Sequence, residues 1–164
     1  MTTTPQIRAA RHDDIDVLVE FNAAMALETE SKTLDPDILR AGIARMLAEP
    51  NRGFYLVAEV GGEVAGCVMV TYEWSDWRNG DWWWLQSVYV RPGQRRYGVF
   101  RALFAEVERR AEQSADAIGL RLYVERDNRR AQETYATLGM REDHYRIFDK
   151  PLRGDVRDVL RQHG

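Results

Sequence analysis

Five stretches of the chain either alternate apolar and polar residues or run continuously apolar, aromatic and β-branched, as strands do. The clearest alternation is Leu120, Leu122 and Val124. Gly61 and Gly62, between two of these stretches, are a tight-hairpin signal. The pattern predicts strands over residues 6–10, 54–59, 63–73, 82–90 and 119–125.

Between the strands, apolar residues recur every three to four positions, which places them on one face of an α-helix. Asp13 is predicted to cap the first helix, and Asp35 followed by Pro36 starts the second. The predicted order is β-α-α-β-β-β-α-β-α-β, in which a sixth strand follows the last helix. A polar tail over residues 153–164 comes after it and is either a short helix or frayed. The expected apolar faces are Ile15, Leu18, Phe21 and Met25; Leu39, Ile43, Met46 and Leu47; Val99, Phe100, Leu103, Phe104 and Val107; and Ala131, Tyr135 and Leu138.

Composition narrows the class of protein. A chain of 164 residues predicts one domain, 1–164. A net charge of −3 argues against nucleic acid as the main ligand. No apolar run is long enough to span a membrane, and the first residues lack the pattern of a signal peptide. Cys67 is the single cysteine and lies in an apolar run, so we expect a buried structural thiol and a reducing, cytoplasmic location.

The segment 88–104 carries the strongest chemical signal. A strand ends at Pro92 and Gly93, a turn follows, and a helix starts near Val99. A helix start offers unpaired N–H groups and the positive end of the helix dipole, which together suit a phosphate. Arg95 and Arg96 add positive charge, and Gly98 lets the backbone approach a ligand closely. The alternative is an ordinary strand–helix turn with two solvated arginines.

The spacing fits neither a P-loop nor a dinucleotide fingerprint. Arg95-x-x-Gly98-x-Phe100 instead resembles the acyl-CoA pyrophosphate loop of the GNAT family of N-acetyltransferases, Q/R-x-x-G-x-G/A. Phe100 departs from that pattern, because the family has a small residue there.

A second motif follows at the expected distance. Asn128, Ala131, Tyr135 and Gly139 are similar to the family's closing pattern N-x-x-A-x-x-x-Y-x-x-x-G, so the two motifs span residues 82–140. The resemblance implies an α/β fold (α+β by some schemes). It implies a mixed sheet of about six to seven strands, splayed between the fourth and fifth strands, with about four flanking helices.

The resemblance also implies a function: transfer of an acetyl group from acetyl-CoA, or another short-chain acyl-CoA, to a primary amine of a small molecule or peptide. No metal, nucleic acid or membrane is expected, and a homodimer is allowed for. The alternative is a catalytically weak module that binds acyl-CoA as a sensor. By match of position, the Val88 N–H would face the acyl oxygen and Tyr135 would protonate the thiolate. The implied cofactor-binding residues are Val88, Tyr89, Val90, Arg95, Arg96, Tyr97, Gly98, Val99, Phe100, Asn128, Ala131 and Tyr135.

The general base is not evident, because the position where many family members have a glutamate is Gln86. We expect at least one of Glu28, Glu73 or Asp76, with Glu28 and Glu73 favoured, to bind or deprotonate the amine. Desolvation among tryptophans would raise the pKa of such a carboxylate. The alternative is an amine that arrives neutral. Residues 72–84 hold all five tryptophans, as an amine pocket or as a packed hairpin. Trp82 and Trp84 should face opposite to Trp83. The expected substrate-binding residues are Glu28, Trp74, Asp76, Trp77 and Gln86.

Overall fold

The computed structural model describes residues 3–154, and most of the predicted tail lies outside that range. The chain forms two compact units, residues 1–123 and 124–164. The first holds β1 (Gln6–Ala9), α1 (Ile15–Glu30), α2 (Pro36–Ala48), β2 (Gly53–Val60), β3 (Glu63–Ser75), β4 (Gly80–Val90), α3 (Val99–Gln113) and β5 (Ala117–Leu122). Two short 3₁₀ turns, η1 (His12–Asp14) and η2 (Pro92–Gln94), precede α1 and α3. The second unit holds α4 (Arg129–Thr137).

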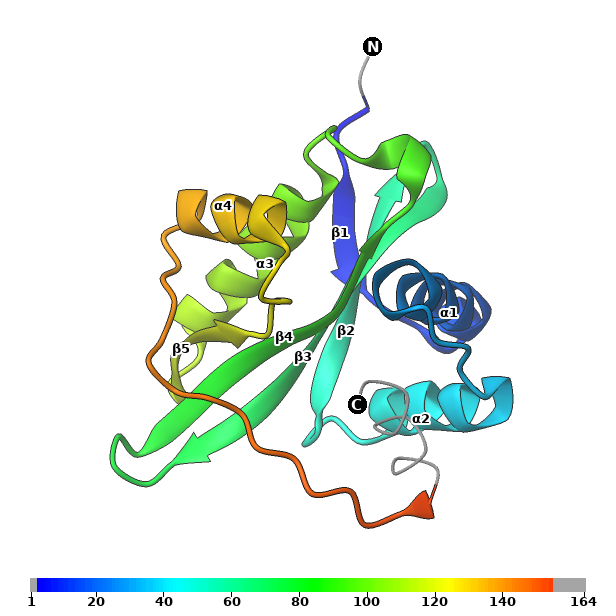
Figure 1. Ribbon diagram of the computed structural model, residues 1–164. Helices are drawn as coiled ribbons and strands as arrows, with labels where there is room; N and C mark the ends of the chain where they lie inside the picture. Colours follow the sequence, from blue (N-terminus) through cyan, green and yellow to red (C-terminus); the bar gives the residue numbers. More distant parts are fainter. Residues whose placement is uncertain (1–2, 155–164) are drawn as a thin grey trace. The chain divides into compact units, whose positions relative to one another are not determined.

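One sheet organises the first unit, with strand order β1-β2-β3-β4-β5 (Figure 1). The first three pairings are antiparallel, and β4 pairs with β5 in parallel through the α3 crossover. The predicted α/β class and mixed sheet are confirmed. The sheet has five strands rather than six to seven, because residues 141–153 form no strand after α4. Tyr145 and Ile147 alternate as a strand would, but both are exposed, and a strand forms only where a neighbour supplies backbone partners.

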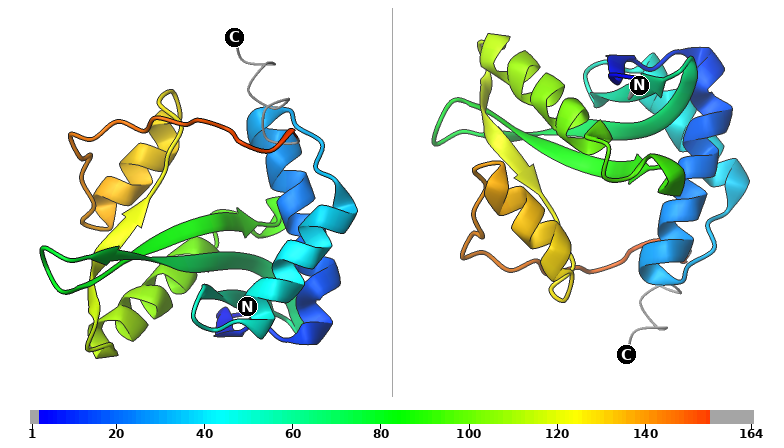
Figure 2. Two further views of the ribbon diagram at one scale, coloured as in Figure 1. Left: turned by 90° about the horizontal axis from the view of Figure 1, so that it is seen from below. Right: turned by 90° about the horizontal axis from the view of Figure 1, so that it is seen from above.

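Two apolar layers cover the sheet. On one face α1 and α2 lie side by side (Figure 2) and bury a cluster that includes Phe21, Tyr55 and Tyr89. On the other face α3 packs through its apolar stripe, which includes Leu103 and Val107. This two-sided burial explains why β2 and β3 read as nearly continuous apolar runs. Cys67 is buried, as predicted, and burial raises the pKa of its thiol to about 12.

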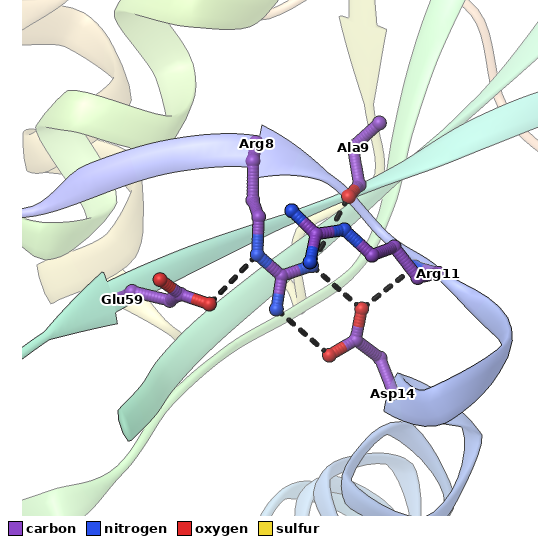
Figure 3. A network of polar contacts seen from close by, with 5 residues as sticks. All are labelled: Arg8, Ala9, Arg11, Asp14 and Glu59. Atoms are coloured by element: carbon purple, nitrogen blue, oxygen red, sulfur yellow. Dashed lines mark hydrogen bonds and ion pairs between the residues drawn. The ribbon is translucent and has the colours of Figure 1, made fainter. Parts of the chain in front are cut away.

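The entry to α1 is fixed by a charged network rather than by the predicted cap. Asp13 is exposed, whereas Asp14 is buried and forms two hydrogen bonds with the Arg8 guanidinium, at 2.7 and 3.0 Å (Figure 3). Asp14 also accepts the Arg11 backbone N–H at 2.6 Å, and Arg8 donates to Glu59 at 2.7 Å. The network therefore ties β1, β2 and the start of α1 together. The prediction of Asp13 as the cap was wrong by one position.

This network makes stability depend on pH. Hydrogen bonds from Arg8 hold the pKa of Asp14 below its usual range. A carboxylate with a lowered pKa stabilises the fold above its unfolded pKa of about 3.9 and loses that contribution as the pH falls through its folded-state value. We expect Asp14→Asn to lower the free energy of unfolding at pH 7 by about 1–3 kcal/mol. The difference from wild type should shrink in acid.

Urea unfolding at pH 7 and at several values below pH 4 measures this effect. Asp13→Asn, one residue away on the exposed side of the same turn, is the matched control and should leave the midpoint unchanged. Equal losses for the two variants, or an Asp14→Asn deficit that stays constant down the acid series, would contradict the assignment.

Candidate active site

A β-bulge interrupts β4. Met69 on β3 pairs with Gln86 on β4. Cys67 lies two residues before Met69, but its partner Tyr89 lies three residues after Gln86. One extra residue is therefore accommodated in β4, and Ser87 takes a φ of 50°, which non-glycine residues seldom adopt. Before the bulge, odd-numbered β4 side chains such as Leu85 face α3; after it, Tyr89 faces α1.

The bulge coincides with the point where β4 and β5 separate. Their parallel pairing runs from Asp81 to Leu85 on β4 and ends at Leu122 on β5, whereas β4 continues beside β3 to Val90. The splay expected between the fourth and fifth strands is therefore present. It opens β4 from Gln86 onward on the side where β5 would otherwise pair.

The backbone of β4 past the bulge offers hydrogen-bonding groups to this opening. The Arg91 N–H donates to the Ala65 carbonyl on β3 at 2.8 Å. Because alternate residues of a strand turn their backbone groups to opposite edges, Val88 and Val90 present theirs away from β3. The Val90 carbonyl accepts the Arg95 Nε at 2.8 Å. An extended ligand lying in the splay would meet the Val88 N–H and carbonyl.

The turn after β4 leads directly into the start of α3. Arg96 has a φ of 70° and Gly98, the N-cap, has a φ of 81° with no side chain to cap the helix. A Cβ added at Gly98 would meet nothing within 4 Å, so the space in front of the helix start is open. These features fit the phosphates of CoA: first-turn N–H groups without intrahelical partners, the positive end of a 15-residue helix, and exposed Arg96 and Tyr97. Phe100 points along α3 toward Phe104, with ring centroids 6.1 Å apart.

Arg95 and Glu28 lie together, although 67 residues separate them. An Arg95 Nη2–Glu28 Oε2 ion pair measures 2.7 Å, and the Tyr89 hydroxyl donates to the other Glu28 oxygen at 3.1 Å. The hydrogen bond from Arg95 holds the pKa of Glu28 below its usual range. The expected raised pKa was therefore wrong for Glu28, since a guanidinium partner outweighs desolvation at this partly exposed site.

The remaining predicted acceptor residues fall into two groups. Gln86 and Glu73 lie near the splay: Gln86 donates to the Thr71 hydroxyl at 2.6 Å, and Glu73 accepts from Trp84 and Arg121 at 3.0 and 2.8 Å. By contrast, Trp74, Asp76 and Trp77 lie at the β3–β4 hairpin end. Eight residues separate Gly80 from Val88, about 26 Å of strand, so the structure does not bring this second group to the bulge.

The tryptophan run divides between the faces of the sheet, as predicted. Trp83 is buried on the α3 side against Phe54, with ring centroids 5.4 Å apart. Trp82 and Trp84 face the opposite side. There Trp84 packs against Tyr123 in a tilted arrangement, with ring centroids 4.3 Å apart. Sequence reasoning missed Thr71, Arg121 and Tyr123, although alternation within 119–125 already placed Arg121 and Tyr123 opposite the apolar residues of β5.

In the second unit, the closing motif builds the start of a helix. The Asn128 side chain accepts the Ala131 N–H at 3.1 Å, so Asn128 is the N-cap of α4. Gly139 follows the helix with a φ of 85°, as a residue just past a helix end often does. Tyr135 is on α4, and burial raises the pKa of its phenol.

Comparisons with known proteins identify the family to which this chain belongs. The family model described as "Acetyltransferase (GNAT) family" matches residues 18–140. A crystal structure of a possible acetyltransferase from Clostridium difficile 630 is 42% identical, has a TM-score of 0.85, and is matched over 91% of this chain and 98% of its own. The chain therefore belongs to the GNAT acetyltransferase family. No curated protein matches it.

Two more distant structures share the fold. A predicted acetyltransferase from Clostridium acetobutylicum, crystallised with acetyl-CoA, has a TM-score of 0.72 at 16% identity, over 90% of this chain and 96% of that one. The protein AAC(6')-Iy, in complex with a bisubstrate analogue of CoA and acetylneamine, has a TM-score of 0.74 at 17% identity, over 92% and 100%.

Within residues 3–154, no three His, Cys, Asp or Glu side chains gather in a way that could hold a metal ion. Over the same residues, no helix combines the length and the apolar character that crossing a membrane requires.

Proposed function

We propose that this protein transfers an acetyl or similar short acyl group from acyl-CoA to a primary amine. The observation that carries the proposal is the Ser87 bulge together with the end of β4–β5 pairing at Leu85 and Leu122, which leaves the Val88 and Val90 backbone facing the splay. Family membership and the acetyl-CoA bound to a structural relative support the same co-substrate.

We place the phosphates, the pantetheine arm and the thioester of acyl-CoA on the first unit. The phosphates would lie at the α3 N-terminus, near Arg95, Arg96, Tyr97, Gly98, Val99 and Phe100. The pantetheine arm would pair with the backbone of Val88 and with the Val90 N–H, because Tyr89 between them turns its backbone groups to β3 and the Val90 carbonyl already accepts from Arg95. The Val88 N–H would then donate to the thioester oxygen as that oxygen gains negative charge, the kind of stabilisation that usually contributes most to acyl transfer.

The reaction forms one bond and breaks one. The nitrogen of a neutral amine attacks the thioester carbon, the carbon–sulfur bond breaks, and the thiolate takes a proton while the amine loses one. We assign the proton donor to Tyr135 because it matches the tyrosine of the family's closing motif, and its phenol carries a proton at neutral pH. In the second unit, Asn128 and Ala131 would set the start of the helix that carries Tyr135.

The ionised state of Glu28 argues against its use as the base. A base that titrates near pH 7 sets the acidic limb of kcat/KM, whereas Glu28 stays ionised throughout the neutral range because its pKa is lowered. We therefore expect Glu28→Gln to leave the position of that limb unchanged. Rate profiles from pH 5.5 to 9 measure this, with Glu20→Gln, a surface α1 glutamate paired with Arg91, as the control. A displaced limb in Glu28→Gln alone would make Glu28 the base.

One set of contacts favours the binding-module alternative. Gln86 is not basic, and the carboxylates of both Glu28 and Glu73 are paired with arginines. A GNAT domain without a free base could bind acyl-CoA and turn it over slowly. Transfer would then depend on amines that arrive neutral, and the rate would rise with pH through the pKa of the amine.

The test is release of CoA thiol from acetyl-CoA with a panel of primary amines, corrected for release without amine. Amine-dependent release supports the enzyme. Binding of CoA with no amine-dependent release across the panel would support the sensor module. Absence of any CoA binding would contradict both.

A further inference from the structure

The sheet carries a second feature beside the splay, on the face opposite α3. Five side chains from three strands lie there together with Tyr123, the residue after β5, and we name the six the acceptor strip: Thr71, Glu73, Trp84, Gln86, Arg121 and Tyr123. Their common face follows from the pairing register, in which Thr71 lies opposite Trp84, Trp84 opposite Arg121, and Tyr123 two residues beyond Arg121. None of these residues faces the α3 core.

The strip begins where β4 opens. Trp84 and Gln86 flank Leu85, the last β4 residue paired with β5. Tyr123 follows Leu122, the last paired residue of β5. The tilted Trp84–Tyr123 pair therefore lies at the entrance to the splay, and Tyr123 is 56% exposed. A group that approaches Val88 along this face of β4 passes this aromatic pair.

The charges of the strip are balanced. The Glu73 side chain is 47% exposed, but its Oε2 already accepts from Arg121 and from the Trp84 indole. The Arg121 guanidinium also lies 3.9 Å from the centre of the Trp82 ring. That ring covers Gly119 so closely that a Cβ there would lie 2.4 Å from it. The contact with the Trp82 ring thus holds the Arg121 guanidinium beside Glu73, where its positive charge offsets the negative charge of the carboxylate.

From these observations we infer that the acceptor is an amine attached by a short linker to an aromatic or other planar group, and not an aliphatic polycation. This inference rests on the proposed acyl transfer. The planar group stacks at Trp84 and Tyr123, where offset or tilted ring contacts are favourable. A polycation gains little, because the Glu73 carboxylate that would attract it is already paired with Arg121.

The experiment compares kcat/KM for matched amines with acetyl-CoA held saturating. The probes are phenethylamine, its saturated analogue cyclohexylethylamine, and the polycation spermidine. We expect phenethylamine to exceed the saturated analogue by about 3- to 10-fold, the size of one ring–ring contact, and spermidine to be the poorest. Equal values for all three, or a preference for spermidine, would overturn the inference while leaving acyl transfer intact.

Three variants locate the effect. Tyr123→Ala should remove the aromatic preference with the KM for acetyl-CoA unchanged. Arg121→Gln should leave the Glu73 carboxylate without its guanidinium and raise kcat/KM for spermidine severalfold. Tyr72→Ala is the control: it removes an aromatic ring from β3 on the opposite face, where Tyr72 packs on Trp83, so the ranking of amines should persist.

Thermal shifts with CoA keep the outcomes distinct. A variant that still responds to CoA has folded, and its amine ranking is then informative. If Tyr123→Ala and Arg121→Gln fold and rank the three amines as wild type does, the strip does not select the acceptor. If wild type binds CoA but uses no amine, the proposed function fails and the inference fails with it.

Discussion

Replacing Gly98 with glutamate is expected to abolish the stabilisation of the fold by CoA. Gly98 has a φ of 81°, which disfavours any side chain, and the space in front of it is open toward the α3 N-terminus. A carboxylate there would repel the CoA phosphates and occupy their place at the helix dipole. Wild type should gain about 2.7 kcal/mol at a CoA concentration 100 times Kd. The variant should gain nothing measurable at the same concentration.

A thermal-shift titration with CoA measures this loss. Gly62→Glu is a closely matched control, because Gly62 has a φ of 84° in the exposed β2–β3 turn and a Cβ added there likewise meets nothing within 4 Å. The Gly62→Glu variant adds the same negative charge, and its side chain strains the backbone to a similar degree because the φ angles of the two glycines are alike. If both variants keep the response to CoA, the phosphates do not bind at the start of α3.

Replacing Tyr135 with phenylalanine is expected to lower kcat by roughly 10- to 1,000-fold, the loss that follows removal of a proton donor. Burial raises the pKa of this phenol, so it is protonated when the thiolate leaves. The affinity for CoA should change little, since only one hydroxyl is removed.

Steady-state rates and CoA titrations on the same preparation separate the two effects. Tyr145→Phe is the control, because Tyr145 is a largely exposed tyrosine of the same unit. A Tyr135→Phe enzyme with unchanged kcat would leave Tyr135 as a packing residue, and the departing thiolate would then take its proton from water.

The strands and helices were readable from local pattern because most of them are long and strongly periodic. The predicted second helix starts at Pro36, as observed, since proline at the first helical turn leaves little ambiguity. The position of the β4 bulge could not be predicted from the sequence pattern. Ser87 adopts a left-handed conformation without the glycine that usually marks one, and the reversal of faces at Tyr89 follows from that single residue.

Side-chain partners far apart in sequence were the main gap. The Glu28–Arg95 pair joins the end of α1 to the turn before α3, and the Glu73–Arg121 pair joins β3 to β5 across β4. The Glu73–Arg121 pair depends on which strands are neighbours and on their register, and the Glu28–Arg95 pair depends on how α1 packs on the sheet. The motifs indicated where CoA would bind, but the arginines that pair with Glu28 and Glu73 became visible only with the sheet assembled.

Mass spectrometry of the amine product tests the central claim most directly. With trideuteroacetyl-CoA as donor, we expect an amine product that carries the trideuteroacetyl group in full and forms in proportion to the CoA released. The Gly98→Glu protein should form none. Release of CoA with labelled acetate as the only product would contradict transfer to an amine and would leave a thioester-binding domain with slow hydrolysis.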